Sequence, residues 1–339
     1  MPSDPTMTDK ELDGIYAFAV QLGKDAGKML LEAAQLRFSG GGQPPQEFVE
    51  KDNAVDIVTK TDEEVEAFIK TSIAERYPHH NFIGEETYSK SPSRAYLISP
   101  TSPTPTWLVD PLDGTVNYTH LFPMFCVSIA VVIAGQPIIG VIYAPFLNQL
   151  FTACRGRSAW LNETQRLPLI LEPAVPPMPR NAPGGCIFAC EWGKDRRDGA
   201  DGNLRRKVES FVTMAAEATA KDRKGGMVHG VRSLGSATLD LAYTAMGAFD
   251  IWWEGGCWEW DVAAGIAILQ EAGGLVTTAN PPEDYATAEI EEVSLGSRLY
   301  LAIRPAGSSE SESGRQGQER VVREVWRRVR ELDYTRPGV

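Results

Sequence analysis

The 339-residue sequence has little histidine, few cysteines and no long uncharged apolar run. Its four histidines show no metal-ligand spacing, which argues against a zinc hydrolase. Its five cysteines are odd in number and form no C-x-x-C pair, so we expect buried free thiols instead of disulfides. The N-terminus has no basic region followed by an apolar one, and no run is long enough to cross a bilayer. We therefore expect a cytoplasmic protein without a membrane partner.

Positive charge is also in deficit. The 33 Lys and Arg residues against 45 Asp and Glu residues give a formal net charge of -12. This balance argues against a nucleic-acid partner. An acidic surface also repels phosphorylated molecules, so a phosphate site in this chain would need metal cations to invert the local field. The hydrophobic content of 43% is that of an ordinary globular protein, long enough to bury a sizeable core.

The most informative stretch is W-L-V-D-P-L-D-G-T-V-N-Y-T-H at residues 107–120. An apolar run ends at Asp110, a proline turn follows, and Asp113 comes three residues after Asp110. Both carboxylates can therefore converge on one hard cation. Gly114 allows the backbone to approach an anion closely, and Thr115 adds a hydroxyl. A helix that begins here would direct its free N–H groups to the same point. Metal-binding carboxylates beside an anion-binding helix start are the parts needed to hydrolyse a phosphate ester.

Helical and strand patterns alternate along the chain, and several strands look hairpin-connected. We therefore expect an α/β (α+β) protein with mixed sheets. The periodicity predicts helices over 9–38, 63–76, 204–220, 236–246, 262–272 and 319–332. Strands are predicted at 82–83, within 124–153, and at 186–190, 229–232, 249–253, 275–277 and 297–303.

Two irregular segments interrupt this pattern. Residues 87–106, rich in Ser, Pro and Thr, predict an exposed insertion, and residues 170–184, with five prolines, predict a linker or surface crossing. We place a subdomain boundary in the second segment. It divides an N-terminal α+β subdomain (1–184), with most of the candidate metal ligands, from a C-terminal α/β subdomain (185–339), with Asp261 and the substrate pocket. Together they would form one compact catalytic unit.

Several other acids have a purely structural interpretation when each is taken alone. Asp62 and Asp261 each precede a predicted helix and could be only caps, and residues 85–86 could lie in a solvated turn. For Asp110 and Asp113 this interpretation is weaker, because apolar residues flank their turn. Several of these acids end an apolar strand, often beside glycine. Strand ends are where α/β sheets gather catalytic side chains, which favours a common site.

Three motifs resemble those of the inositol monophosphatase family: G-E-E at 84–86, D-P-L-D-G-T-V-N-Y at 110–118 and W-D-V-A-A-G at 260–265. That family comprises magnesium-dependent, lithium-sensitive phosphatases related to fructose-1,6-bisphosphatase. The similarity extends over residues 56–274. It implies a layered αβαβα sandwich and a homodimer. The insertions at 87–106 and 170–184 are similar to those of fungal members, including members associated with quinate utilisation.

The resemblance also implies a set of metal ligands. Glu85, Asp110 and the backbone carbonyl of Leu112 would bind one Mg²⁺, and Asp110, Asp113 and Asp261 would bind a second. A weaker third ion would involve Glu85, so the cofactor would be about two to three Mg²⁺ ions.

Catalytic and substrate-binding roles follow from the same resemblance. Asp62 would pair with the Thr115 hydroxyl to orient and deprotonate the attacking water, and the N–H groups of Gly114 and Thr115 would hold the phosphate. Lys51 would lie near the metal site. The implied substrate contacts are Glu254, Ser233, Asp113 and Asp261.

The leading hypothesis is a magnesium-dependent phosphomonoesterase that acts on inositol monophosphate or a similar small polyol or sugar phosphate. One alternative is a nucleotide 3′-phosphatase or sugar bisphosphatase of the same superfamily, although the continuation D-G-T-V-N-Y-T-H favours the monophosphatase branch. Another is a non-catalytic regulatory protein on this scaffold. Against it, every metal-ligand position of the family is filled here by the expected type of residue.

The sequence departs from the family around the predicted substrate pocket. Trp258 and Glu259 add bulk and charge there, unless both point away into packing. The loop 191–197 is unusually charged, and Arg196 or Arg197 could meet a second anionic group on the substrate, although such a loop could also be only solvated. These residues leave the substrate open.

Overall fold

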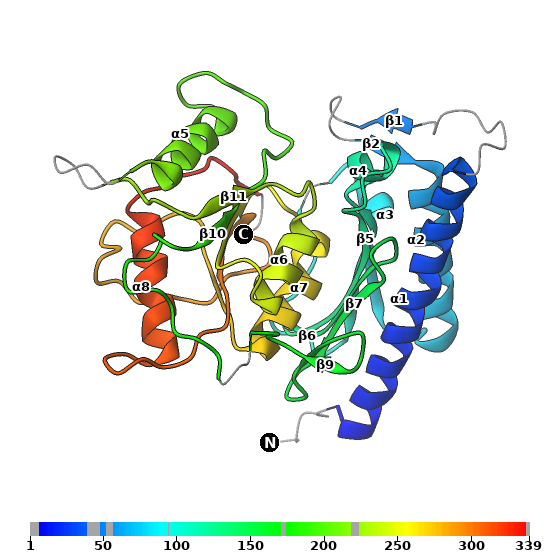
Figure 1. The fold of residues 1–339 in the computed structure, drawn as a ribbon. Helices are drawn as coiled ribbons and strands as arrows, with labels where there is room; N and C mark the ends of the chain where they lie inside the picture. Colours follow the sequence, from blue (N-terminus) through cyan, green and yellow to red (C-terminus); the bar gives the residue numbers. More distant parts are fainter. Residues whose placement is uncertain are drawn as a thin grey trace.

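The computed structural model describes residues 7–38, 48–51, 57–93, 95–170, 174–217 and 224–336. Five layers follow one another across the molecule, alternating between helices and sheets (Figure 1). This arrangement is the expected αβαβα sandwich. The helical layers are α1 (Asp9–Phe38) with α2 (Lys60–Arg76), then α6 (Ala237–Met246) with α7 (Glu259–Ala272), and α8 (Gly314–Trp326) with α5 (Asn203–Ala215) on the far side.

The first sheet has seven strands in the order β3-β4-β5-β6-β7-β8-β9. Only β3 and β4 pair in parallel among them, and all other neighbours are antiparallel, as the hairpin pattern of the sequence predicts. The strands are β3 (Asn81–Gly84), β4 (Thr106–Asp113), β5 (Cys126–Ile133), β6 (Gln136–Ala144), β7 (Gln149–Cys154), β8 (Ala159–Leu161) and β9 (Gln165–Arg166).

The second sheet has five strands in the order β11-β10-β12-β14-β13. Strand β10 is parallel to both neighbours, whereas β14 is antiparallel to β12 and β13, so this sheet is mixed as well. Its strands are β10 (Ile187–Ala189), β11 (Gly230–Arg232), β12 (Ile251–Gly255), β13 (Leu275–Thr277) and β14 (Leu299–Ile303). Outside both sheets, β1 (Phe48–Glu50) pairs with β2 (Ile57–Thr59), and α3 (Glu85–Ser89) and α4 (Thr115–Thr119) are short helices.

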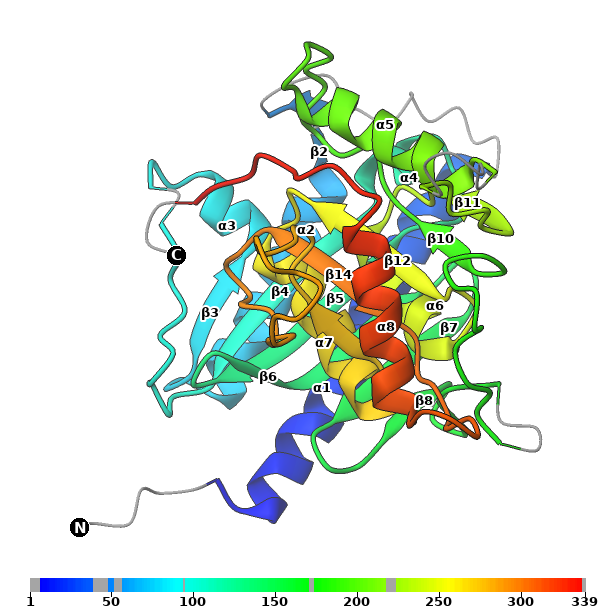
Figure 2. The same cartoon turned by 90° about the vertical axis from the view of Figure 1, so that its left-hand side faces the viewer.

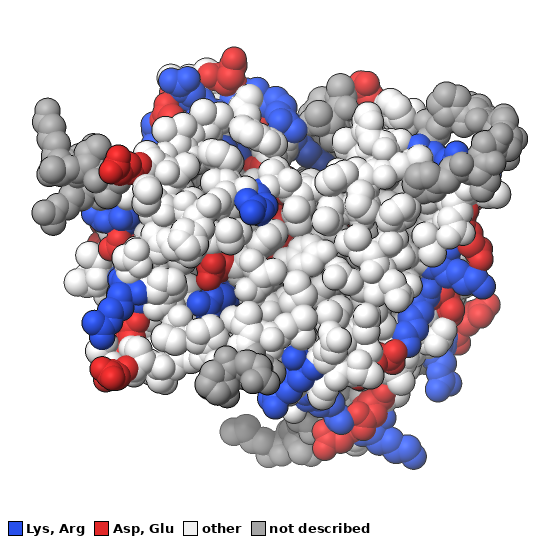
Figure 3. All heavy atoms as spheres, in the orientation of Figure 1, with Lys and Arg blue, Asp and Glu red and all other residues white. Residues whose placement is uncertain are grey.

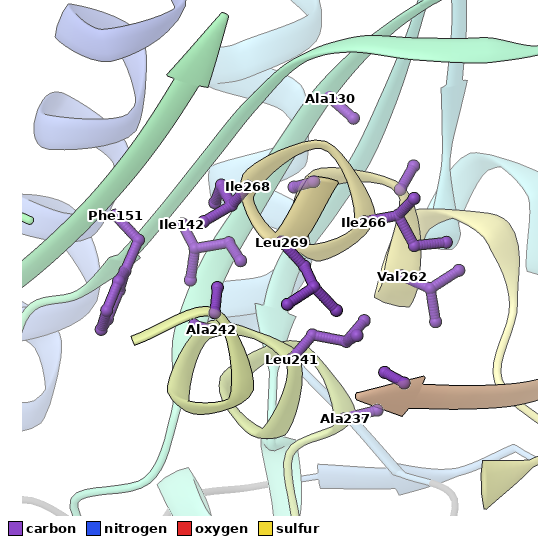
Figure 4. Packing of buried hydrophobic residues seen from close by; sticks show 14 of the residues in the cluster. Ala130, Ile142, Phe151, Ala237, Leu241, Ala242, Val262, Ile266, Ile268 and Leu269 are labelled. Carbon is purple, nitrogen blue, oxygen red and sulfur yellow. The ribbon is translucent and has the colours of Figure 1, made fainter. Parts of the chain in front are cut away.

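Helices α6 and α7 form the centre of the molecule because they pack against both sheets. Leu241 and Leu269 lie between Ile142 and Phe151 of the first sheet and the strands of the second (Figure 4). Helix α7 comes so close to β6 that a Cβ atom on Gly140 would lie 2.3 Å from the carbonyl oxygen of Ala264. Only glycine permits this contact, which fixes α7, and therefore its N-terminus, against the first sheet.

Two helices end earlier than predicted, because α5 stops at Ala215 instead of residue 220 and α8 stops at Trp326 instead of residue 332. Three predicted helix starts were wrong by three residues or more, and capping explains each of these. Helix α2 begins at Lys60 with Thr59 as its N-cap, so Asp62 is the third helical residue instead of the cap. Helix α7 begins at Glu259 instead of residue 262, and Asp261 takes the same third position. A capping box that begins at Ser313 starts α8 at Gly314, five residues before the predicted start.

The two irregular segments are more closely packed than expected. In the predicted exposed insertion, Tyr88 and Ile98 belong to the buried core. In the proline-rich segment, Met178 is buried, and the Arg304 guanidinium donates hydrogen bonds of 3.2 Å to the carbonyls of Pro176 and Pro177. The described part of this segment, residues 174–184, is therefore a packed surface crossing. The proposed subdomain boundary at residue 184 falls between β9 and β10 and stays a prediction.

Other expectations concern cysteines, helix ends and charge. All five cysteines are free and buried, as predicted. The residues that follow the predicted first helix, and residue 56 at the start of the family similarity, lie outside the described residues. Among the described helices, none combines the length and apolar character needed to cross a membrane. On the face shown in Figure 3, charged side chains of both signs lie mainly around the periphery.

Candidate metal and phosphate site

Asp110 and Asp113 lie at the end of β4, where the strand departs from regular pairing. Side chains of a regular strand alternate between its faces, so residues three apart would point in opposite directions. Here Asp110 pairs with Ser128 while Asp113 pairs with Cys126. The chain therefore advances three residues along β4 for two residues along β5, which is a β-bulge. This bulge brings both carboxylates to the same face, the one that α7 covers. The proline turn seen in the sequence is this bulge.

Asp261 reaches the same point from the second half of the chain. It lies in the first turn of α7, where one carboxylate oxygen accepts a 2.7 Å hydrogen bond from the Trp258 N–H. The hydroxyl of Ser128 on β5 donates to the Trp260 carbonyl at 3.0 Å and ties this turn to the first sheet. Asp110, Asp113 and Asp261 each offer an oxygen within 4.8 Å of the others.

The negative charges of these three acids repel one another. Burial raises the pKa of Asp110 well above its usual value, and the neighbouring acids Glu85, Asp113 and Asp261 raise it further. Burial likewise raises the pKa of Asp261, and that of Asp113 to about 6. Three converging carboxylates that resist ionisation need a compensating cation. Their hard oxygen donors suit Mg²⁺ or a similar divalent ion, so the residues present fit the expected cofactor.

Glu85 stands beside this cluster with a different balance of charge. Its carboxylate forms an ion pair with Lys51 at 3.0 Å, and Lys51 also pairs with Glu86 at 2.7 Å. The Lys194 amine lies 4.0 Å from the same Glu85 carboxylate. Burial alone would raise the pKa of Glu85, but Lys51 and Lys194 reverse this effect and lower it. Residues 85–86 are therefore no solvated turn, and Lys51 lies where the resemblance places it.

Asp62 and Thr115 meet beside the cluster. The Thr115 hydroxyl lies 3.3 Å from Asp62 and 3.0 Å from the carbonyl oxygen of Leu112, so it can donate to either. Burial raises the pKa of Asp62 to about 6, although hydrogen bonds from Thr59 lower it. Asp62 thus completes the capping box of α2 with one oxygen and faces Thr115 with the other.

Gly114 turns the chain between the acids and Thr115. Its φ of 86° lies in the left-handed region, and a Cβ atom there would come within 2.7 Å of the Met124 carbonyl oxygen. Any other residue would be strained and would clash with backbone. Asn117 holds the same turn, because its side-chain amide donates to the carbonyls of Met124 at 2.6 Å and Leu234 at 2.7 Å.

One cavity of about 410 Å³ gathers nearly all the predicted site residues. Asp62 does not line this cavity, but it contacts Thr115, which does. A neighbouring cavity of about 870 Å³ shares Glu85, Lys194 and Trp258 with it. The predicted residues that line the first cavity are Glu85, Asp110, Leu112, Asp113, Gly114, Thr115, Ser233, Glu254 and Asp261.

The predicted substrate contacts have partners that the sequence did not reveal. Glu254 forms a buried ion pair with Lys207, and only 1% of each side chain is exposed. Ser233 donates to Glu191 at 2.8 Å, and Ser236 donates to Asp113. Of these missed residues, only Ser236 carries a sequence signal, because serine directly before a helical pattern is a typical N-cap.

The two bulky residues near the pocket point in different directions. Glu259 is fully buried and pairs with Arg336, which arrives with the C-terminal segment that crosses towards α3 (Figure 2). Arg336 also donates to the Tyr88 hydroxyl at 2.9 Å. Trp258, in contrast, lines the cavity, and the Arg298 guanidinium lies 3.9 Å from its ring centroid. Only Trp258 adds bulk to the pocket.

The fold and the cavity together define an αβαβα protein with a carboxylate cluster at a strand end. The sequence profile of the Inositol monophosphatase family matches residues 11–330, and the chain belongs to that family. A Neurospora crassa protein named "Quinic acid degradation cluster protein x" is 72% identical, over 98% of each chain. "Inositol monophosphatase 2" of Saccharomyces cerevisiae is 38% identical over 84% of this chain and 87% of its own.

Solved structures agree with this assignment. The structure of inositol monophosphatase from Anabaena superposes with a TM-score of 0.64 at 26% identity, and the match covers 93% of this chain and 96% of that one. The suhB extragenic suppressor protein from Bartonella henselae gives the same TM-score at 28% identity, with 91% and 98% covered. Family membership supports a metal-dependent phosphatase.

Proposed function

We propose that the protein is a phosphomonoesterase that hydrolyses phosphate esters of small ring polyols, with inositol monophosphate as the simplest candidate. The main support is the convergence of Asp110, Asp113 and Asp261 with Thr115 on one cavity. The relatives support a ring polyol as well, because their names refer either to inositol monophosphatase or to quinic acid degradation.

We propose Mg²⁺ as the cofactor, held by the carboxylates of Asp110, Asp113 and Asp261, with Glu85 and the Leu112 carbonyl at the side of the cluster. When bound, such ions neutralise phosphoryl oxygens, acidify a water and stabilise the leaving alkoxide. The chain itself supplies the geometry. The bulge in β4 and the fixed N-terminus of α7 bring the donors together, and burial leaves the carboxylates with little water to compete for the cation.

Asp62 and Thr115 would handle the attacking water. The Thr115 hydroxyl would donate its hydrogen to Asp62, which would leave the oxygen lone pairs to accept a hydrogen bond from the water. Proton transfer through this pair to Asp62 Oδ1 would generate the nucleophile, since a carboxylate with a pKa near 6 is largely ionised at neutral pH yet basic enough to accept a proton. Gly114 and Thr115 line the cavity beside them and would orient the phosphate through their N–H groups.

Phosphate release from a panel of inositol, sugar and nucleotide phosphates, with sugar bisphosphates included, tests this function. We expect release from the ring-polyol esters that requires Mg²⁺ and stops with a chelator. The Arg205→Gln variant, changed on the exposed face of α5, provides a matched control with unaltered activity. No release from any ester, with Mg²⁺ binding confirmed by calorimetry, would leave the non-catalytic alternative. Preference for a nucleotide or bisphosphate would indicate the other enzymatic branch.

Two further properties are proposed on the family resemblance. Lithium should inhibit turnover by displacing a weakly held Mg²⁺, and lithium-insensitive hydrolysis would contradict this. The protein should form a homodimer, and light scattering on the purified chain will give its mass directly.

A further inference from the structure

The acids on the substrate side of the cavity are already engaged within the protein. Glu254 pairs with Lys207 and also accepts hydrogen bonds from the N–H groups of Glu191 at 2.7 Å and Gly255 at 3.0 Å. The Glu191 carboxylate accepts from the Ser233 hydroxyl at 2.8 Å and from the Gly235 N–H at 2.9 Å. Because most of their acceptor capacity is filled, these acids offer little to the hydroxyls of a neutral polyol.

Two cations line the same cavity, Lys194 and Arg196. Lys194 lies 4.0 Å from Glu85, so part of its charge faces the metal site. Arg197 is turned elsewhere, to Asp195 at 2.7 Å and Asp333 at 3.9 Å. Within the described part of the chain, no carboxylate lies within ion-pair distance of Arg196. Of the two arginines in this loop, the structure thus selects Arg196 as the one that can meet an anion in the cavity.

The loop that carries Arg196 is fastened at several points. The Trp192 ring stacks on Phe211 of α5, with centroids 5.9 Å apart and an interplanar angle of 20°. Asp195 accepts a 2.7 Å hydrogen bond from the side-chain amide of Asn203, which begins α5. The residues on both sides of Arg196 are therefore anchored, so this exposed residue of the cavity lining can bind an anion at a reduced entropic cost.

We propose that the physiological substrate carries a carboxylate on its polyol ring in addition to the phosphate, and that Arg196 binds this carboxylate. The inference rests on the proposed function and refines its substrate class to a phosphorylated polyhydroxy carboxylic acid. One guanidinium matches one carboxylate in charge and in planar geometry. A second phosphate would bring two negative charges into a cavity that several carboxylates already line, and Arg196 would offer only one positive charge to balance them. The exposed apolar side chains of Val116, Phe122 and Trp192 offer a wall for the CH faces of the ring.

The test compares four synthetic ring-polyol phosphates that differ at one ring position: carboxylate, carboxamide, hydrogen, or a second phosphate. With the Mg²⁺-loaded wild type, we expect kcat/KM for the carboxylate to exceed that for the carboxamide by roughly fivefold to tenfold, the range of a partly exposed charged hydrogen bond. Arg196→Gln should bring this ratio close to one, while Arg205→Gln should leave it unchanged. Equal rates for carboxylate and carboxamide in the wild type would overturn the inference and leave the phosphatase function standing.

Calorimetry with the corresponding non-hydrolysable phosphonates separates the two ideas. If no ester is hydrolysed, the proposed function fails, yet tighter binding of the carboxylate phosphonate than of the carboxamide, lost in Arg196→Gln, would still support the anion subsite. Equal binding would overturn it. Arg196-dependent preference for the second phosphate over the carboxylate would overturn the assignment of a carboxylate.

Discussion

The Thr115 hydroxyl lies 3.3 Å from a carboxylate oxygen of Asp62, although 53 residues separate the two along the chain. Asp62 lies in the first turn of α2, in the outer helical layer, and Thr115 begins α4 after the last residues of β4. The pair therefore joins a helix of one layer to the strand end of the next. It also joins the proposed proton acceptor to the cavity, because Thr115 lines the cavity wall and Asp62 lies behind it.

Thr115→Val tests this relationship. The variant keeps the shape of the side chain but removes the hydroxyl, so we expect kcat for phosphate release to fall by about 10²-fold or more, the usual contribution of a positioned proton-transfer group. Thr115→Ser keeps the hydroxyl and should retain most of the rate. Near-normal kcat in Thr115→Val, or a loss in Thr115→Ser as large as that in Thr115→Val, would contradict the proposed role of the hydroxyl.

Asp110→Asn tests the metal cluster. The amide cannot share a full negative charge between cations, so Mg²⁺ binding measured by calorimetry should weaken strongly and turnover should be lost. The metal-free variant should be at least as stable as wild type in urea denaturation. The change replaces a buried carboxyl, whose raised pKa shows that burial disfavours its ionised form, with a neutral amide. Near-normal turnover, or a variant that unfolds more easily than wild type without metal, would contradict the site.

The metal-free protein should lose stability as the pH rises. Burial raises the pKa of Asp62 and Asp113 to about 6 and also raises the pKa of Asp110 and Asp261, whereas the same groups titrate near 3.8 when exposed. Between about pH 5 and 7.5 the native state therefore binds more protons than the unfolded state, and the free energy of unfolding falls as pH rises. Glu85 has a lowered pKa and loses its contribution only below this window.

Thermal unfolding in a chelator at pH 5.5 and 7.5 measures this effect. The melting temperature should be lower at pH 7.5, and added Mg²⁺ should raise it more at pH 7.5 than at pH 5.5. Asp110→Asn serves as the reference, since it removes one of the titrating groups and should flatten the decline. A wild-type melting temperature that rises with pH in the chelator would refute the raised pKa values.

Lys207→Met tests the buried ion pair behind the cavity. The substitution preserves much of the side-chain volume but leaves Glu254 buried without its cation, so the free energy of unfolding should fall by about 3–5 kcal/mol. Lys60→Met removes the exposed pair with Glu64 and should leave the free energy of unfolding almost unchanged. Urea denaturation of both variants gives the comparison, and a loss below about 1 kcal/mol for Lys207→Met would contradict the model of a desolvated pair.

Much of the fold was readable because its signals are local. The long amphipathic pattern of α1, the apolar strands on both sides of Gly135 and the uncharged run of α7 all describe single elements whose burial follows from their own sequence. The helix starts at Lys60 and Gly314 were misplaced because a capping box competes with hydrophobic periodicity for the boundary, and its residues look like ordinary polar loop residues in sequence.

The sequence by itself determined the kind of chemistry. Asp110, Asp113, Gly114 and Thr115 are adjacent along the chain, so one bulge and one left-handed glycine suffice to assemble them. Only the tertiary structure decided what surrounds them. Glu254 is matched by Lys207 across 47 residues, and the two neighbouring arginines of one loop turn to different sides. Such partnerships depend on how the layers stack, because burial and charge pairing are properties of the packed molecule and leave no periodic trace in the chain.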